Sequence, residues 1–262
     1  MSLDLSSPEG NLRGFLKARA SLDGEDTVTW FTGNVHAWIP GGKHTHLFGF
    51  EGYNVSRVAE ADGGYDLLTR EAVFYLDPET RQILEKWKNP FIDDEVGVTH
   101  VWNDPVNQPL RLDGPRGPFH VPVTGIGDDV FFNLDIFLAY PSPLPRAQFP
   151  ENSQGDLYQA VELFQFYAKR SEIENESVLS AEAKVSWTRI APWLPWMRMG
   201  DRPGQLVYHC RGSKLPGGYQ DLPEWIKAYV ESNDAKFASA PREFTQPNET
   251  SWTYFRKQLE RS

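Results

Sequence analysis

Titratable and amide side chains gather in the segment HVWNDPVN, residues 100–107. His100 could act as a general acid or base, because the unperturbed pKa of an imidazole lies near neutral pH. His100 and Trp102 are two residues apart, so in a strand they would share a face and point into a cavity, with Trp102 as an apolar wall. Asn103 could donate to a developing oxyanion, and Asp104 could orient an imidazole.

The same segment also fits a purely structural turn. Asp-Pro is typical turn chemistry, and the Asn103 side chain can hydrogen-bond to its own backbone. Pro105 would end a strand and fix the direction in which the chain leaves it. Two interpretations therefore stay open: a turn alone, or a turn that also carries a site. If His100 is structural, Glu51 and His209 are the next candidates for a catalytic base.

A second candidate region is residues 187–204, WTRIAPWLPWMRMGDRPG, with three Trp, two Met and three Pro. Its prolines prevent a regular helix or a central strand. Because this loop is so apolar, it must be buried in the core, line a cavity or contact a partner. Trp193, Trp196 and Met197 could form a wall against which a flat substrate stacks, while Arg189 holds an anionic or phenolic group. Alternatively, the loop plugs one end of the fold.

Polar residues also interrupt apolar strand patterns. Glu51, Asn54 and Arg57 lie in LFGFEGYNVSR, and Glu71 lies in TREAVFYL. A polar inner face is what a ligand-binding barrel needs, but the solvated face of any antiparallel sheet shows the same pattern. His209, in LVYHCRG, alternates with apolar neighbours and fits a core residue as well as a catalyst.

The predicted site combines these regions. The candidate catalytic residues are His100, Asn103, Arg57, Glu51 and His209, and the candidate substrate-binding residues are Trp102, Asn54, Arg189, Trp193, Trp196, Met197 and Tyr53.

Metal and thiol chemistry have weaker signals. His44 and His46 form the motif HTH, in which residues i and i+2 share a strand face and could bind a metal with a third ligand. A metal-dependent hydrolase is therefore a further alternative. No other spacing resembles a ligand set, and we expect no stoichiometric metal and no cofactor. Cys210 is the single cysteine, so no internal disulfide can form, and we expect a buried, inert thiol.

Composition and missing motifs narrow the function classes. The formal net charge is -10, and no basic stripe favours nucleic acid. Phosphate-binding, dinucleotide-binding and nucleophile-elbow signatures are absent. No segment reaches the roughly 18 apolar residues that span a bilayer, and the N-terminus lacks the apolar core of a signal peptide. We therefore expect a cytoplasmic protein without a nucleic-acid or membrane partner. Aromatic residues make up 13% of the chain, which favours a large core or a lined cavity.

The elements that would position these residues are mainly strands. Ser6 and Ser7 can cap a first helix. Short runs rich in Thr, Val and aromatic residues, bounded by turn signals, then predict antiparallel strands. Residues 65–87 predict a hairpin around Asp-Pro-Glu-Thr, whereas residues 157–170 fit either a helix or a buried strand. SWTYFRKQLE, near the C-terminus, predicts a short helix.

We therefore expect a mainly β fold: an antiparallel β-barrel or strongly curled, calycin-like sheet with peripheral helices at the N- and C-terminal ends. A single domain would cover residues 1–262, with a β-rich body over about 26–213 and a helical tail over about 221–259. Within the tail, residues 221–232 predict a helix with one apolar stripe. Small barrels hold a single ligand inside, so this architecture would suit a small-molecule site.

Several blocks together resemble one family. They are LFGFEGYNVSR, EAVFYLDPETRQILEKWKNPF, HVWNDPVN, SWTRIAPWLPWMRMGDRPGQLVYH and PNETSWTYFRK. They resemble the signature blocks of the DUF1838 family, a bacterial and fungal domain of unknown function, over about residues 10–258. The resemblance implies a cytosolic protein associated with the catabolism or tailoring of aromatic compounds. It supplies no catalytic residues.

Together these features predict a cofactor-independent acid/base enzyme, a lyase, dehydratase or isomerase, acting on a hydrophobic aromatic small molecule. Formaldehyde-releasing retro-aldol cleavage is one concrete case, because it needs only a base, a donor for developing negative charge and a dry pocket. The alternative is a non-catalytic protein that binds a small hydrophobic ligand in the same cavity. A second copy of the chain, in a homodimer, is a further potential partner.

Overall fold

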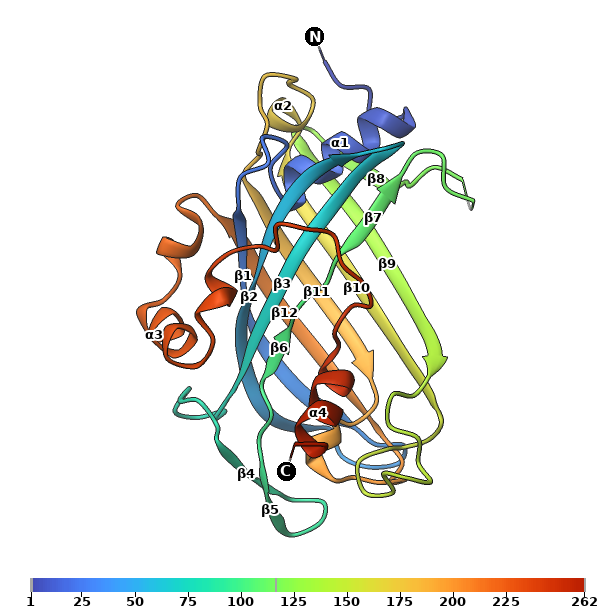
Figure 1. Ribbon diagram of the computed structural model, residues 1–262, viewed down its shortest axis with the longest axis vertical. Coiled ribbons are helices and arrows are strands. Elements are labelled where there is room, and N and C mark those ends of the chain that lie inside the picture. Colours follow the sequence, from blue (N-terminus) through green and yellow to red (C-terminus); the bar gives the residue numbers. More distant parts are fainter. Residues whose placement is uncertain (1, 116, 262) are drawn as a thin grey trace.

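The computed structural model describes residues 2–115 and 117–261 and is mainly β (Figure 1). Ten strands form one antiparallel sheet in the order β6-β3-β2-β1-β12-β11-β10-β9-β8, with β7 also pairing with β3, while β4 and β5 form a separate two-stranded sheet. The strands are β1 (Thr27–Trp38), β2 (Thr45–Ala61), β3 (Gly64–Leu76), β4 (Lys86–Asn89), β5 (Asp94–Gly97), β6 (Val101–Asn103), β7 (Gln108–Arg111), β8 (Val123–Ile126), β9 (Asp129–Pro141), β10 (Leu157–Lys169), β11 (Ala183–Ala191) and β12 (Gln205–Leu215).

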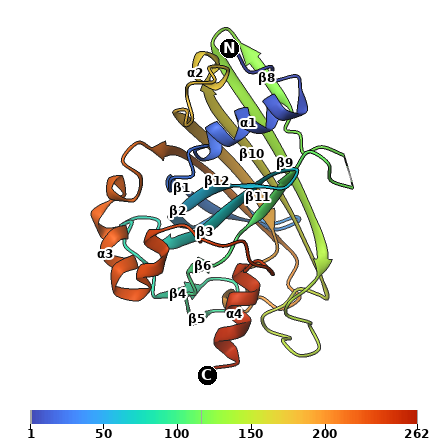
Figure 2. The same ribbon diagram turned by 45° about the horizontal axis from the view of Figure 1, so that its top comes forward.

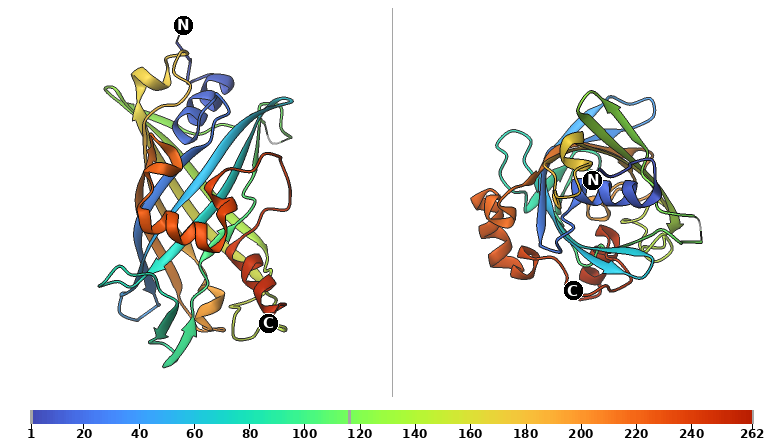
Figure 3. Two further views of the ribbon diagram at one scale, coloured as in Figure 1. Left: turned by 60° about the vertical axis from the view of Figure 1, so that its left-hand side comes forward. Right: turned by 90° about the horizontal axis from the view of Figure 1, so that it is seen from above.

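Short helices lie around the sheet (Figures 2 and 3). They are α1 (Pro8–Arg19), α2 (Arg170–Ile173), α3 (Glu224–Asn233) and α4 (Ser251–Leu259), with the 3₁₀ turns η1 (Pro195–Met197), η2 (Gly218–Asp221) and η3 (Ala235–Ala238). The helices expected after the Ser6-Ser7 pair and near residues 221–232 and 251–259 are confirmed. None of the described helices is both long and apolar enough to cross a membrane.

The sheet consists of two consecutive meanders that meet where β1 pairs with β12. At this seam Gly33 lies opposite Cys210, and a Cβ atom on Gly33 would lie 2.2 Å from the carbonyl oxygen of His209. A glycine is therefore required for the two strands to approach this closely.

The predicted barrel, or strongly curled calycin-like sheet, is wrong in that the sheet is open. β6 and β8 end the strand order, and no ladder joins them within the described residues. One end of the gap is bridged by α1 instead. Asn11 exchanges two hydrogen bonds of 2.8 Å with Val121, just before β8, and Arg19 donates to Ser56 of β2 at 3.0 Å. These side-chain bonds connect the two sides where a barrel would need a ladder.

Two local expectations are resolved by the structure. Residues 157–169 form strand β10, not a helix. The hairpin predicted over residues 65–87 does not continue beyond its turn, because only the single bridge Leu76↔Ile83 follows and β4 pairs with β5. Trp87, at the end of that segment, is buried against Phe48 and Trp196, and this packing draws the chain away from β3.

Both faces of the β2–β3 pair are covered. One face carries Ala72, Phe74 and Leu76 of β3, which pack in one apolar cluster with Ile226 and Val230 of α3. The alternate residues of β3 point to the opposite face, which lines a cavity. Successive side chains of β3 therefore point alternately toward helix α3 and toward the cavity. Neither face of this strand pair is the solvent-exposed face that an antiparallel sheet often has.

Candidate functional site

A cavity of about 560 Å³ lies on this second face of the sheet. Its walls come from strands of both meanders, from α1 and from residues 248–251. Aromatic side chains supply much of the wall, among them Phe31, Phe50, Phe164, Phe166, Trp187 and Tyr208. A cavity of this size and lining suits a small, largely apolar molecule.

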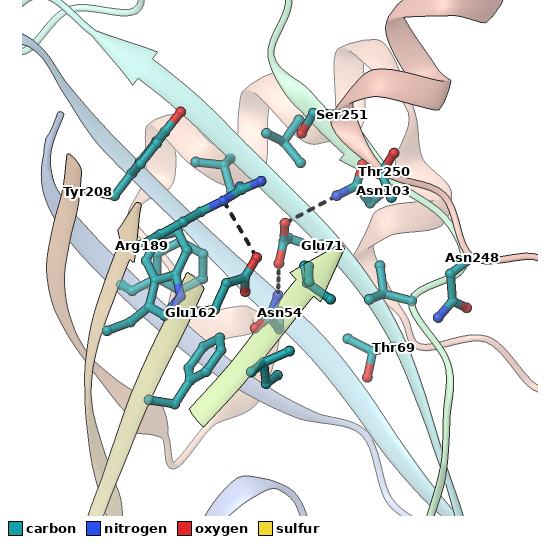
Figure 4. A pocket seen from close by; sticks show the side chains of 18 of the residues that line it. Asn54, Thr69, Glu71, Asn103, Glu162, Arg189, Tyr208, Asn248, Thr250 and Ser251 are labelled. Atoms are coloured by element: carbon teal, nitrogen blue, oxygen red, sulfur yellow. Dashed lines mark hydrogen bonds and ion pairs between the residues drawn. The ribbon is translucent and has the colours of Figure 1, made fainter. Parts of the chain in front are cut away.

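Five acidic or basic side chains interrupt the apolar wall: Arg19, Glu71, Glu162, Arg189 and Glu249, of which Glu249 pairs with Lys257 at 2.6 Å. Figure 4 shows Glu71, Glu162 and Arg189 pointing toward one another from different strands. Since a charge removed from water is costly unless it is paired, the arrangement of partners determines what each group can do.

Glu71 is held by two amides. Asn54 Nδ2 donates to its Oε2 at 3.0 Å, and Asn103 Nδ2 donates to its Oε1 at 3.3 Å. Burial raises the pKa of Glu71, and the hydrogen bond from Asn54 and the cations Arg189 and Arg19 oppose this shift only in part. Glu71 is thus a carboxyl group that keeps its proton to a higher pH than an exposed glutamate.

Arg189 is anchored on the opposite wall. Its Nε lies 3.5 Å from Glu162 Oε1, and its Nη2 donates to the hydroxyl of Tyr158 at 2.5 Å. The guanidinium carbon also lies 5.6 Å from the centre of the Tyr208 ring. These contacts fix the guanidinium in one orientation, which is the requirement for a preorganised electrostatic group.

Several polar atoms of the cavity wall have no hydrogen-bond partner in the part of the chain that the structure describes. They include Asn103 Oδ1 and Trp187 Nε1. Burial also raises the pKa of Tyr208, so its hydroxyl keeps its proton and can donate. Buried polar atoms are normally paired, so these groups are suited to contact a bound molecule.

Three of the predicted site residues lie at the cavity: Asn54, Asn103 and Arg189. Cys210 also lines it, and burial raises the pKa of its thiol to about 12. At neutral pH this cysteine is a thiol rather than a thiolate nucleophile.

The structure does not bring His100 and Trp102 to the cavity. In β6 the cavity side chains are Val101 and Asn103, so Trp102 points to the other face and packs against Phe237. The buried His100 precedes the strand, and its Nδ1 accepts the backbone N–H of Tyr75 at 3.2 Å. Burial lowers the pKa of His100 to about 4, so its imidazole is neutral at physiological pH.

Four other predicted residues also lie outside the cavity lining, because they occupy the alternate positions of their strands. Glu51 accepts the indole N–H of Trp30 at 2.8 Å, and Arg57 pairs with Asp26 at 2.9 Å. The hydroxyl of Tyr53 donates to the carbonyl of Phe237 at 3.0 Å. His209 is exposed, and its Nδ1 lies 3.1 Å from the Thr188 hydroxyl.

The apolar loop after β11 packs into the core. Trp193, Trp196 and Met197 are almost completely buried and line no part of the cavity. The indole N–H of Trp193 donates to the carbonyl of Arg202 at 3.0 Å, and Trp196 packs between Phe48, Tyr75 and Trp87. The loop therefore fills one end of the fold, which was the structural alternative to an aromatic wall.

The HVWNDPVN segment connects the sheet to the C-terminal part of the chain. Asp104 pairs with Arg70 at 2.9 Å and with Lys236 at 3.2 Å, so the structure shows no contact in which it orients an imidazole. The backbone N–H of Asn107 donates to Asn248 Oδ1 at 2.8 Å, and Asn248 Nδ2 returns a bond of 2.8 Å. The predicted turn is wrong, because β6 and β7 both pair with β3 in the same direction and residues 104–107 are an irregular interruption between them. Through Asn103 the segment also contributes to the cavity.

The histidines considered as metal ligands lie outside the cavity lining. The ring centroids of His36 and His44 are 4.6 Å apart, and those of His36 and His46 are 4.9 Å apart. Among the residues that the structure describes, no group of three or more His, Cys, Asp or Glu is arranged to hold a metal ion.

The prediction omitted several cavity residues. Glu71 is a polar residue in a predicted strand, but the solvent-exposed face of an antiparallel sheet shows the same pattern. Glu162 is a lone carboxylate in the apolar segment LYQAVELFQFY, and treating that segment as a strand would have revealed it. Arg19, at the end of α1, and Tyr158, the hydrogen-bond partner of Arg189, carry no sequence signal of a site.

The chain matches one family model. The model of DUF1838, described as a protein of unknown function, covers residues 24–259, so the chain belongs to this family. No curated protein matches the chain. The family description assigns no activity.

Proposed function

We propose that this member of the DUF1838 family is an enzyme that performs acid/base chemistry, without an organic cofactor, on a small hydrophobic aromatic molecule bound in the cavity. The observation that supports this most directly is the position of Glu71, a half-buried cavity carboxyl with a raised pKa, close to the Arg189–Glu162 pair. A carboxyl with a raised pKa is a stronger base than an exposed glutamate, and it can take up a proton and return it.

The surrounding groups suggest how the work is divided. Glu71 would transfer the proton. Arg189, fixed by Glu162 and Tyr158, would stabilise negative charge that develops on the substrate, and the hydroxyl of Tyr208 would donate to the same charge. The aromatic walls would exclude water and strengthen these interactions.

A lyase, dehydratase or isomerase step fits this set of groups, because each requires removal of a proton from one atom and delivery of a proton to another. In the retro-aldol case, the ionised Glu71 carboxylate removes a hydroxyl proton and formaldehyde leaves as the C–C bond breaks. The electron pair of that bond passes to the aryl-bearing carbon, which then receives the proton from the Glu71 carboxyl. Arg189 would stabilise the carbanion before it is protonated.

A second candidate function is binding without catalysis. Both carboxyl oxygens of Glu71 already accept hydrogen bonds, and Arg189 already has a carboxylate partner. A satisfied polar network of this kind is also what a carrier needs to hold a ligand in one orientation. The two functions differ only in whether a bound molecule is converted.

The test is to incubate the protein in D₂O with a panel of hydroxymethyl and acidic C–H aryl compounds and to follow each compound by proton NMR. We expect at least one compound to be cleaved, dehydrated or deuterated. Glu71→Gln should slow that conversion by roughly 100-fold or more, the usual size of a general acid/base contribution. The exposed Glu60 supplies a matched control, since Glu60→Gln should leave the rate unchanged.

Two results would count against this proposal. Compounds that bind but remain unchanged would favour the carrier. Conversion by Glu71→Gln at the wild-type rate would remove Glu71 from the mechanism.

A further inference from the structure

Arg19 is a cation of the cavity that has no carboxylate within ion-pair distance among the described residues, although the charge of Glu71 acts on it from farther away. It ends α1, lines the cavity and makes two side-chain hydrogen bonds, to Ser56 Oγ at 3.0 Å and to Asn54 Oδ1 at 3.3 Å. Both partners are neutral. Within the described part of the chain, no carboxylate forms an ion pair with Arg19, whereas Arg189 has Glu162.

The charge of Arg19 persists at neutral pH. Burial lowers the pKa of its guanidinium to about 10, which still leaves it protonated. A guanidinium has five N–H donors, and the two hydrogen bonds to Ser56 and Asn54 use only part of them. Asn54 stands between Arg19 and Glu71, because its Oδ1 accepts from Arg19 while its Nδ2 donates to Glu71.

We infer that Arg19 is the subsite for a carboxylate group of the ligand, so that the cavity takes a small aromatic carboxylic acid. This inference rests on the proposed function, in which the cavity holds the substrate. The carboxylate would lie at the α1 end of the cavity and direct the rest of the molecule toward Glu71 and Arg189.

The surroundings favour a carboxylate over a phosphate. Arg19 is a single cation that can balance one negative charge, because Arg189 is already committed to Glu162. A carboxylate carries one charge, whereas a phosphate carries about −1.5 to −2 at pH 7. Phe15 lies one helical turn before Arg19 on the same face of α1, and both residues line the cavity. A cation with an aromatic neighbour suits a monoanion attached to an apolar ring better than a doubly charged group.

A structural role for Arg19 is the competing explanation. Its position in the last turn of α1 places it near the carbonyl end of the helix, which favours a cation, and its bonds connect the helix to β2. In that case removing the charge would affect all ligands of the cavity equally, and the experiment must separate the two explanations.

The test uses two probes of nearly equal shape, 2-naphthoate and the neutral 2-naphthamide, titrated into the full chain by isothermal calorimetry at about pH 7.5. The wild type should bind naphthoate at least about 10-fold more tightly than naphthamide, the scale of one charge-assisted hydrogen-bond pair. Arg19→Met should abolish this preference and leave naphthamide binding unchanged. Arg19→Lys, which keeps the charge but loses the fork, should retain part of it.

Arg211→Met is the matched control, because Arg211 is exposed on β12 and lies outside the cavity lining. It should leave both affinities unchanged. If the wild type binds both probes equally, or if Arg19→Met or Arg19→Lys weakens both alike, the carboxylate subsite is refuted while the proposed function stands. If neither probe binds the wild type, the subsite and the proposed aromatic-binding cavity fail together. Unchanged naphthamide binding also shows that a variant has folded.

Discussion

Asn103 lies directly opposite Glu71 in the register of β6 and β3, and Asn54 lies directly opposite the same residue in the register of β2 and β3. The two amides therefore reach the two carboxyl oxygens as cross-strand neighbours. The orientation of Glu71 is consequently set by strand pairing, which is more rigid than a loop.

Removing one of these amides should show how far the ionised carboxyl depends on it. Asn103→Leu removes the donor to Glu71 Oε1 at similar volume. We expect the free energy of unfolding to fall by about 1–3 kcal/mol at pH values where Glu71 is ionised, and by less where it is protonated. Urea unfolding at two pH values measures the difference. Asn233→Leu, on the exposed surface of α3, should show no such difference, and an equal loss for Asn103→Leu at both pH values would contradict the prediction.

Glu71 itself should make stability depend on pH. Because burial raises its pKa, the folded protein keeps this proton to a higher pH than the unfolded chain does. Stability should therefore fall as pH rises from about 4.3, the unfolded value, through the raised pKa, and remain lower above it. Glu71→Gln cannot ionise, so the fall should disappear. Denaturant midpoints of both proteins across this pH range provide the comparison, and a difference independent of pH would disprove the assignment.

His100 should act in the opposite pH direction. Burial lowers its pKa to about 4, so the unfolded chain binds a proton that the folded protein excludes. Stability should be lost as pH falls from about 6.5 toward 4, by roughly 3 kcal/mol in total. His100→Gln should remove this acid sensitivity.

The same variant tests the role expected for His100 as a general base. Because the side chain lies outside the cavity lining, we expect turnover on any substrate to stay within about 2-fold of the wild type, against the roughly 100-fold loss of a missing base. If His100→Gln greatly reduced turnover without changing stability at acidic pH, His100 would be a catalytic residue after all.

Cys210 should be inert in the folded protein. With a thiol pKa of about 12, its thiolate fraction at pH 8 should be roughly three orders of magnitude below that of an unfolded cysteine. Reaction with a disulfide reagent should be correspondingly slow under native conditions and fast in denaturant. A ligand that fills the cavity should slow it further. Comparable native and denatured rates would show that the thiol is accessible and activated.

The junction between Asn107 and Asn248 should hold the C-terminal segment against the cavity. Asn248→Ala removes two hydrogen bonds of 2.8 Å, and we expect a loss of about 1–3 kcal/mol and faster amide exchange at Asn107. Gln246→Ala provides the comparison, since its contacts to the same region are 3.4 and 3.5 Å and should matter less. Equal effects of the two variants would rule out a special role for Asn248.

The strand content and the terminal helices could be predicted from the sequence, because alternation, turn residues and helix caps are local signals. The face of each strand that lines the cavity could not be predicted. In β2, the side chain of Asn54 points to one face of the sheet, and those of Glu51, Tyr53 and Arg57 point to the other. The sequence does not show which face lines the cavity, because that depends on the packing of α3 against the opposite face. Arg19 and Glu162 come from elements far apart in the chain, and only the assembled sheet brings them to one cavity. The open sheet could not be predicted either, because individual side chains of α1 connect β2 to the chain just before β8.

The seam between β1 and β12 has a consequence for how the protein could be divided. If the backbone were cut between β7 and β8, each piece would retain a complete meander, and among the described strands the β1–β12 ladder would be the one long pairing shared by the two pieces. Eleven residue pairs, from Val28↔Leu215 to Trp38↔Gln205, make up that ladder. Two separately produced fragments should therefore reassemble by pairing β1 of one with β12 of the other. A bulky residue in place of Gly33 should prevent this reassembly.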